Sequence, residues 1–341
     1  MIIELRNLCE KFFDKIWYES PKNLSYSLKF CYFFLKFFSL IYLFVVFLRK
    51  KIYKVFLVKN SYKAKIWVVG NLTVGGNGKS IIVGWLANYL IKQGYKVAIV
   101  SKGYNRNSKK LLHVNKDSKI EEVGDEPLML SYQVSCIILV ANSRALAFDY
   151  LDEKYNLDYI LCDDGLQDYT VLYDKKFLVI NNNRMFGNKA LLPSGPLREP
   201  IYFLDSINAA LIVNFNKKDK ARCDEFSFPY YQADIEIDKI YSLSDQKDIF
   251  DTKCAKVNIV TAIADHERFV MFVKSLGFKI NSVSFFADHY VFCKNDFAGF
   301  SNKEIIFVSE KDAVKCKGLH KNIWVVAIKA KPDLQFIEDF L

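Results

Sequence analysis

Apolar runs alternate with amphipathic stretches along most of this chain, and the alternation predicts its fold. Residues 65–70 (KIWVVG) form a short apolar run typical of a buried strand, residues 81–93 (IIVGWLANYLIKQ) have helical periodicity, and residues 94–100 (GYKVAIV) begin a second strand. A strand, a helix and a strand in this order predict a βαβ unit with a right-handed crossover. Because the alternation continues to about residue 215, the sequence predicts an α/β fold with a mostly parallel sheet, whose ligands bind at the carboxyl ends of the strands.

The N-terminal 50 residues differ, because one long apolar stretch there is interrupted by regularly spaced lysines. The stretch begins at a Ser-Pro pair, a favourable helix start, and residues 22–48 contain no Pro or Gly. Lys22, Lys29 and Lys36 recur every seven residues and therefore share one helical face. Phe, Leu, Ile and Val occupy much of the remaining surface, and the basic residues 49–51 follow.

Three interpretations of this helix remain open. A spanning helix needs about 20 apolar residues, and residues 29–48 qualify only by burying Lys36 at a cost of roughly 2.5–3.5 kcal/mol. An interfacial helix lets the lysines reach the headgroups while the Phe-rich face enters the acyl region. A buried core helix would not tolerate three lysines on one stripe. We favour the interfacial helix and expect membrane association.

Changes in pattern along the chain predict four parts. Residues 1–50 are expected to form the membrane-associated helical segment, and residues 51–234, which contain the glycine-rich segment GGNGKS (75–80), are expected to form a domain of the P-loop NTPase type. Residues 235–255 are expected to be a linker of two short strands, beginning with IEIDKIYSLSDQKDIFD. Residues 256–341 are expected to form a smaller C-terminal α/β domain, which opens with a strand-helix unit.

The net charge of +10 is concentrated at the N-terminus, where residues 1–65 hold 13 of the Lys and Arg residues and only four acids. The remainder is close to neutral, which argues against a nucleic-acid-binding face and favours attraction to anionic lipid headgroups. The eight cysteines are scattered and form no CxxC pair, so the sequence supports no zinc ribbon or redox motif. No obligate protein partner is evident.

The segment between the first strand and the first helix has the composition of a phosphate-binding loop. In NLTVGGNGKS (71–80) the glycines let backbone N–H groups surround phosphates, Lys79 reaches the β- and γ-oxygens, and Ser80 ligates Mg²⁺ at the helix N-terminus. Thr73 stands where the strict pattern has Gly, so the motif is a variant. The loop predicts ATP and Mg²⁺ as ligands, and its contacts are expected from Thr73, Gly75, Gly76, Asn77, Gly78, Lys79 and Ser80.

Carboxylates follow two of the later strands. Asp163 and Asp164 end the apolar run LDYILC, where a P-loop protein places the Asp that holds Mg²⁺. Asp125, in GDEP, is expected at the same edge of the sheet, and a carboxylate is the usual base for a phosphoryl acceptor hydroxyl. His289 lies between apolar runs, and on the sequence alone a structural role is the simpler interpretation.

Taken together, these segments resemble the tetraacyldisaccharide 4'-kinases, the lipid A 4'-kinases of Gram-negative bacteria. The resemblance spans residues 66–317, includes the Thr73 variant of the loop, and rests on motifs in family order: GNLTVGGNGKS (70–80), SKGYNR (101–106), VGDEP (123–127), DDGLQ (163–167), LLPSGPLREP (191–200), FFADHY (285–290) and SEKDAVK (309–315). It implies transfer of the ATP γ-phosphate to the 4'-hydroxyl of a tetraacyldisaccharide 1-phosphate. It also implies a peripheral or monotopic position at the cytoplasmic face of the inner membrane.

The resemblance further assigns roles to the polar residues of these motifs. It implies that Lys79 and Ser80 contact phosphate and Mg²⁺, with Ser80, Asp163 and Asp164 at the metal. Asp125 becomes the base and His289 its partner, which replaces the structural interpretation of that histidine, because a His beside a carboxylate can orient it and tune its basicity. The positions that match contacts to the lipid headgroup are Arg144, Gln167, Arg198 and Glu199. The two arginines are candidates for the 1-phosphate.

Three residues depart from the family pattern. Lys102 and Asn105 replace Arg and Gly in the usual SRGYGR, and Asp168 replaces the His that usually follows DDGLQ. Asp168 leaves the geometry of the acceptor site open. Two other functions share part of the pattern: a membrane-associated P-loop ATPase switch and a nucleotide-binding module without turnover. Neither gives a reason for LLPSGPLREP or for the Asp-His pair.

Overall fold

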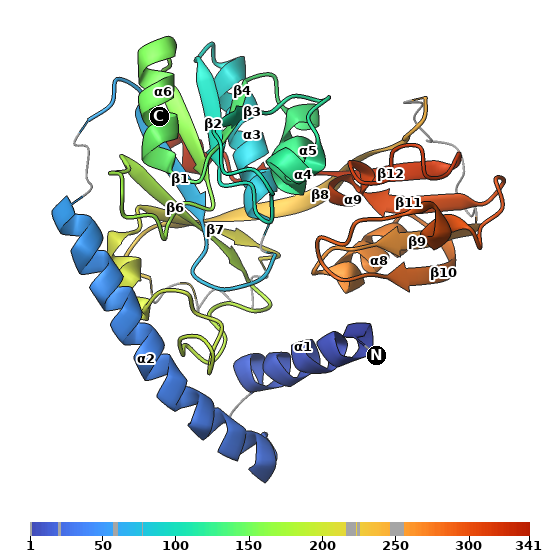
Figure 1. Ribbon diagram of the computed structural model, residues 1–341, viewed down its shortest axis with the longest axis horizontal. Coiled ribbons are helices and arrows are strands. Elements are labelled where there is room, and N and C mark those ends of the chain that lie inside the picture. Colours follow the sequence, from blue (N-terminus) through green and yellow to red (C-terminus); the bar gives the residue numbers. More distant parts are fainter. Residues whose placement is uncertain are drawn as a thin grey trace.

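The computed structural model describes residues 2–19, 22–56, 61–76, 78–215, 223, 226–245 and 256–341. These residues form two lobes that share one sheet, with two N-terminal helices on the outside (Figure 1). Within the described residues the sheet has twelve strands in the order β10-β9-β11-β12-β8-β7-β6-β1-β5-β2-β4-β3.

The first lobe holds the predicted parallel sheet. Its strands are β1 (Lys65–Gly70), β2 (Val97–Ser101), β3 (Leu112–His113), β4 (Ile137–Val140), β5 (Tyr159–Asp163), β6 (Lys175–Asn181) and β7 (Ala209–Val213). All neighbours pair in parallel except β3 with β4. β1 lies between β5 and β6, and its register sets Val69 opposite Asp163. The loop after β1 and the acids that end β5 therefore meet at one edge, as parallel strands require.

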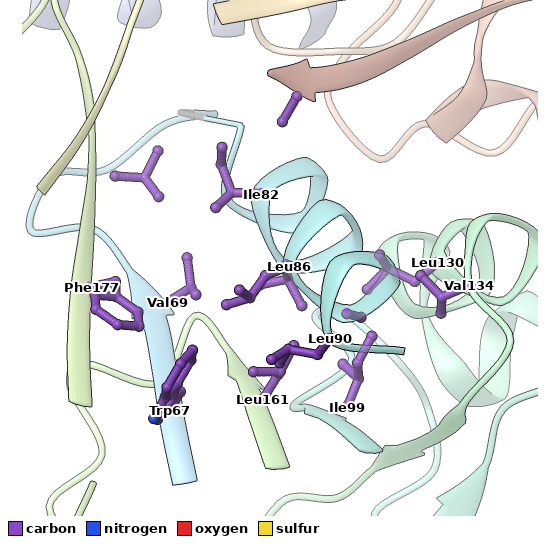
Figure 2. Close-up of a cluster of buried hydrophobic side chains, with 14 of the residues drawn as sticks. Trp67, Val69, Ile82, Leu86, Leu90, Ile99, Leu130, Val134, Leu161 and Phe177 are labelled. Carbon is purple, nitrogen blue, oxygen red and sulfur yellow. The ribbon is translucent and has the colours of Figure 1, made fainter. Parts of the chain in front are cut away.

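Helices cover both faces of this sheet, which explains why the strands are apolar along their whole length. The helices are α3 (Lys79–Lys92), α4 (Ile120–Val123), α5 (Asp125–Gln133) and α6 (Arg144–Lys154), with the 3₁₀ helix η1 (Ile201–Ser206). Figure 2 shows the core between α3 and the sheet, where Ile82, Leu86 and Leu90 face the strand residues Trp67 and Leu161. This packing fixes the N-terminus of α3 at the end of the phosphate loop.

A long two-stranded ribbon connects the lobes. β8 (Tyr230–Ser242) pairs in parallel with β7 at its start and then antiparallel with β12 (Ile323–Pro332) from Ala233 onward. The linker predicted at 235–255 therefore differs from the observed one: β8 crosses its first boundary and its partner strand comes from near the C-terminus. Residues 246–255, where a second strand was expected, lie outside the described residues.

The second lobe is a smaller α/β unit. It contains β9 (Lys256–Thr261), α8 (His266–Ser275), β10 (Lys279–Phe285), η3 (Lys294–Phe297), β11 (Ile305–Ser309) and α9 (Glu310–Ala313). The last helix, α10 (Gln335–Glu338), does not belong to it: the Phe336 and Phe340 rings lie 4.9 and 5.1 Å from the ring of Phe177 in the first lobe. The last residues, which the sequence grouped with the C-terminal domain at 256–341, thus pack on the first lobe, where their aromatic side chains complete the core.

Two helices precede the lobes: α1 (Ile2–Tyr18) and α2 (Tyr26–Phe56). The Ser-Pro pair at 20–21 lies outside the described residues; instead Ser25 caps α2, since its hydroxyl accepts the Leu28 N–H at 3.4 Å. One side of α2 packs on residues 191–198: the Ser39 hydroxyl donates to the Leu191 carbonyl at 2.8 Å and that of Tyr42 to the Arg198 carbonyl at 3.0 Å. α2 is therefore longer than predicted and partly docked.

The outward side of α2 is apolar and exposed. Phe30 and Phe33 are 74% and 76% exposed, and the large exposed side chains continue along the helix: Phe34, Phe37, Phe38, Leu40, Ile41, Phe44, Val45, Phe47 and Leu48. This exposure rules out the buried core helix. By length and composition α2 is also the one helix in the described part of the chain that could cross a membrane.

Candidate active site

A cavity of about 710 Å³ lies between the lobes. The phosphate loop, Asp164 and Arg198 line it from the first lobe, and His289 and Lys311 line it from the second. Residues from segments more than 200 positions apart therefore face one space, and the fold must close around it for the site to exist.

The phosphate loop has the local geometry that its sequence predicts. Gly78 precedes α3 with φ 79°, a left-handed conformation that favours glycine. A Cβ there would also lie 2.9 Å from Cδ1 of Ile235 in β8. Thr73 forms an antiparallel bridge with Leu197 and is not among the residues with positive φ, so a β-branched residue fits where the strict motif has Gly. Asn77 lies outside the described residues.

Lys79 and Ser80, the first residues of α3, point at the acids that follow β5. The Ser80 hydroxyl lies 3.0 Å from Asp163 Oδ2 and 3.2 Å from Glu126 Oε2. The Lys79 ammonium lies 3.7 Å from Asp164 and donates to the Asn71 side chain at 3.3 Å. Burial acts to raise the pKa of Asp164, but Lys79 and Arg198 hold it below the ordinary value. The structure thus brings together four residues that the sequence placed here.

The residues around Ser80 suit Mg²⁺. Asp163 is buried, and its Oδ1 atom has no hydrogen-bond partner in the structure. Burial raises the pKa of this carboxyl to about 7, and the neighbouring Glu126 and Asp164 carboxylates add to the effect. A cation would relieve both the repulsion and the unpaired oxygen. Mg²⁺ typically takes one or two carboxylates from the protein and completes its shell with phosphates and water.

Asp125 and His289 come from different lobes and meet in the cavity. Asp125 begins α5, and its Oδ2 lies 2.7 Å from Nδ1 of His289. His289 has φ 63° and its ring lies 5.0 Å from that of Tyr104. Burial acts to raise the pKa of Asp125, yet the hydrogen bond to His289 and the Lys311 ammonium hold it below its usual range. Asp125 is therefore ionised at neutral pH and able to accept a proton.

Sequence reasoning did not single out three charged residues around this pair. Lys311 lies 3.0 Å from Asp288 and 3.3 Å from Glu126, and 3.4 Å from Nε2 of His289. Burial acts to lower the pKa of Lys311, but these carboxylates and Asp125 raise it, so the side chain is charged. The available signal was the position of Lys311 in SEKDAVK, directly after an apolar strand.

The four residues expected at the acceptor headgroup fall into two groups: Arg198 lines the cavity, whereas Gln167, Glu199 and Arg144 do not. Arg198 is partly exposed and lines the cavity; it pairs with Asp164 at 3.0 Å and also donates to Asn71. Gln167 is half-buried and donates to the Asn71 carbonyl at 2.8 Å. Glu199 is buried, and burial raises its pKa. Arg144 is only 5% exposed. Arg144 does not line the cavity in this structure, and its contact with the acceptor's phosphate stays a prediction.

Arg144 is instead bound to the turn that carries the metal-site acids. It donates to the carbonyls of Asp163 and Asp164 at 3.1 and 2.9 Å and pairs with Asp168 at 3.1 Å. Asp168 in turn accepts from the N–H and the hydroxyl of Thr170 at 3.0 and 2.6 Å. Asp164 has φ 49°, so the arginine holds a turn that is strained for a non-glycine residue. The unusual Asp168 thus supplies the counter-charge of a buried guanidinium.

The other two residues that depart from the family pattern, Asn105 and Lys102, lie in different surroundings. Asn105 has φ 61° and lines the cavity, and Asn is the residue that best tolerates this conformation after glycine. Lys102 is exposed and is not among the residues that line the cavity.

Comparison with known proteins gives a consistent result. The model of the family "Tetraacyldisaccharide-1-P 4'-kinase" matches residues 31–341. Relatives with the name tetraacyldisaccharide 4'-kinase include a protein of Francisella tularensis subsp. novicida, 33% identical over 91% of this chain and 96% of its own length, and one of Wigglesworthia glossinidia brevipalpis, 35% identical over 86% and 79%. The crystal structure of LpxK from Aquifex aeolicus in complex with ATP superposes with a TM-score of 0.73 at 27% identity, covering 89% of this chain and 95% of that one. The chain belongs to the tetraacyldisaccharide-1-P 4'-kinase family.

Proposed function

We propose that Asp125 accepts the hydroxyl proton in the phosphoryl transfer that this family catalyses. The protein is an ATP-dependent kinase for the 4'-hydroxyl of a tetraacyldisaccharide 1-phosphate. The observation that supports the role of Asp125 is its 2.7 Å contact with His289 inside the cavity that the phosphate loop lines. His289 and the Lys311 ammonium lower the pKa of Asp125, so its carboxylate in the cavity is ionised.

The reaction follows from these positions. The acceptor oxygen bonds to the γ-phosphorus while the bond from that phosphorus to the leaving oxygen of ADP breaks, and the hydroxyl proton passes to Asp125. Lys79 stabilises charge on the phosphate oxygens, and the backbone N–H groups of Gly75, Gly76 and Gly78 are available to the β-phosphate. His289 orients the Asp125 carboxylate. Closure of the two lobes around the bound substrates would exclude water, so that transfer to the sugar prevails over hydrolysis.

Magnesium, when bound, neutralises charge on the phosphate oxygens. We assign its protein ligands to the Ser80 hydroxyl and the Asp163 carboxylate, which lie 3.0 Å apart. Asp164, which pairs with both Lys79 and Arg198, keeps these two cations in the cavity. Of the two arginines expected at the acceptor phosphate, Arg198 is the one that lines the cavity.

We further propose that α2 lies in the membrane interface at the cytoplasmic face of the inner membrane. The residues that pack on the first lobe, Ser39, Tyr42 and Val46, lie in the second half of the apolar stretch and on one helical face. A helix that crossed the bilayer would carry this docked lobe into the hydrocarbon region. In an interfacial position the Phe-rich side enters the lipid and the lobe stays in water. The lipid acceptor then reaches the cavity from the membrane surface.

The test is label transfer by the purified full chain in detergent. With γ-labelled ATP, Mg²⁺ and tetraacyldisaccharide 1-phosphate, we expect labelled lipid, and Asp125→Asn should lower kcat by about 10²–10⁴-fold. Because Asn keeps the shape and still accepts from His289, the affinity for ATP should change little. The matched control is Asp117→Asn, an exposed acid in the same lobe.

Three results would contradict this assignment. Hydrolysis of ATP without lipid transfer in the unaltered protein would favour the ATPase switch. A normal kcat in Asp125→Asn would remove its role as the base. Loss of ATP binding in that variant would place Asp125 at the metal site instead.

A further inference from the structure

Lys311 is the one cation that contacts both members of the Asp125–His289 pair among the described residues. It lies in the first turn of α9, directly after Glu310, and its side chain is 16% exposed. Its ammonium lies 3.9 Å from Asp125 and 3.4 Å from Nε2 of His289. Lys311 belongs to the second lobe, whereas Asp125 belongs to the first, so the contact crosses the cavity.

A network of buried hydrogen bonds fixes the backbone that carries Lys311. The next residue, Asp312, is fully buried, and its carboxylate accepts from the Thr261 hydroxyl at 2.7 Å, the Ala262 N–H at 3.1 Å and the Ser309 hydroxyl at 2.8 Å. Lys315 pairs with it at 2.9 Å. These contacts tie α9 to the ends of β9 and β11, so the Lys311 side chain starts from a rigid position.

The geometry restricts where His289 carries its proton. An ammonium can only donate hydrogen bonds, so the imidazole nitrogen that faces it must accept. Nε2 faces Lys311, and therefore the proton of a neutral His289 resides on Nδ1, where it is donated to Asp125.

A ring protonated at Nε2 does not fit the contacts at this position. Its Nε2–H would point toward a positive charge at 3.4 Å, and the nearest alternative acceptor, Oδ2 of Asp288, is 3.5 Å away. The charged groups that face His289 are Asp125, Asp288 and Lys311, and the Tyr104 ring packs beside it.

We propose that Lys311 is a positioning residue that fixes the Nδ1–H tautomer of His289 and holds its loop against Asp125. The lysine also binds Asp288, the residue before His289, at 3.0 Å, so it holds the loop in which His289 has a positive φ. Asp125 then remains the only acceptor for the substrate proton in this pair, since Nε2 is occupied. This inference rests on the proposed role of Asp125 as the base.

The first experiment reads the tautomer directly and does not depend on catalysis. Long-range ¹H–¹⁵N spectra of the histidine-labelled full chain, with His289 assigned by its loss in His289→Asn, should show Nδ1 protonated and Nε2 unprotonated at pH 7.5. Lys311→Met should replace this single pattern with a mixture of tautomers. An imidazolium or an Nε2–H in the unaltered protein, or an unchanged pattern in Lys311→Met, would overturn the proposal.

Kinetics with a matched control separate positioning from substrate binding. Lys311→Met should lower kcat by at least about 10-fold, because the wrong tautomer disables an Asp-His pair, with KM for ATP within about threefold. Lys311→Arg, which keeps the charge, should recover part of the loss. The control is Lys317→Met: Lys317 also crosses to the first lobe, where it donates to Tyr132 of α5, but it does not touch the pair.

The outcomes distinguish the two proposals. A normal kcat in Lys311→Met, or an increase in KM for ATP alone, would show that Lys311 does not position the pair. An equal loss in Lys317→Met would reduce its role to holding the lobes together. If Asp125→Asn keeps its kcat while the tautomer result holds, the base assignment fails and the position of the proton stands.

Discussion

The ion pair between Arg144 and Asp168 offers a quantitative test, because both side chains are nearly inaccessible. Their exposed fractions are 6% and 13%, and the two charges lie 3.1 Å apart. Asp168→Asn removes the negative charge while it keeps the size of the side chain and an oxygen that accepts from Thr170. The guanidinium is then buried without a counter-charge, although its bonds to the carbonyls of Asp163 and Asp164 remain.

The expected cost follows from burial. Breaking a buried pair by removing one partner costs about 3–5 kcal/mol, whereas an exposed pair is worth about 0–1 kcal/mol. With an unfolding entropy of roughly 2 cal/mol/K per residue, a chain of 341 residues should lose about 4–7 °C in Tm. The exposed pair of Lys329 and Asp238 has a similar distance, 2.9 Å, with side chains 50% and 41% exposed. Asp238→Asn should therefore shift Tm by less than about 1.5 °C.

Thermal unfolding of the two variants and the unaltered protein, in the same detergent, measures this difference. We also expect Asp168→Asn to raise KM for ATP, because Arg144 holds the strained turn at Asp164. Equal shifts in Asp168→Asn and Asp238→Asn would refute the reasoning, since the buried pair would then contribute no more than an exposed one. A large shift in Tm with normal kinetics would limit Arg144 to a role in stability.

Three further outcomes are expected. Burial acts to raise the pKa of Asp168, but Thr170 and Arg144 hold it below the ordinary value of about 3.9. The contribution of Asp168 to stability is therefore complete above that pH and is lost only as pH falls through the lowered pKa. The difference in Tm between Asp168→Asn and the unaltered protein should thus be constant from pH 8 to pH 5, and a decline within that range would contradict this reasoning. Gly78→Ala should weaken ATP binding at unchanged secondary structure in circular dichroism, because alanine is strained at this left-handed φ and its Cβ would displace the end of the Ile235 side chain. Normal ATP affinity would disprove this constraint. Replacing Phe34 and Phe37 of α2 with Ser should lower partitioning into phosphatidylglycerol–phosphatidylethanolamine vesicles by about two to four orders of magnitude, at roughly 1.5–3 kcal/mol for each ring. The same loss in the control Leu146→Ser, an exposed residue of the first lobe, would contradict the interfacial position.

Local sequence signals predicted the first lobe well. Its parallel sheet, the strand before the phosphate loop and α3 after it are all observed, because continuous apolar strands and an amphipathic helix can bury their side chains in few other ways. The start of α2 was placed too early, since Ser25 provides a cap as good as the earlier Ser-Pro pair. The linker was misassigned because the partner of β8 is β12, about 90 residues further along, and no local pattern encodes that pairing.

The active site also combines features that the sequence predicts with features that only the tertiary structure decides. The sequence by itself determined the phosphate loop, the acids after β5 and, through their motifs, Asp125 and His289, since each depends on residue type and local spacing. Only the tertiary structure decided that Arg144 is buried against Asp168 and that Lys311 faces the imidazole of His289. Burial and the approach of two lobes depend on contacts between distant segments, and these contacts determine which charged side chains are paired and which remain available to a substrate.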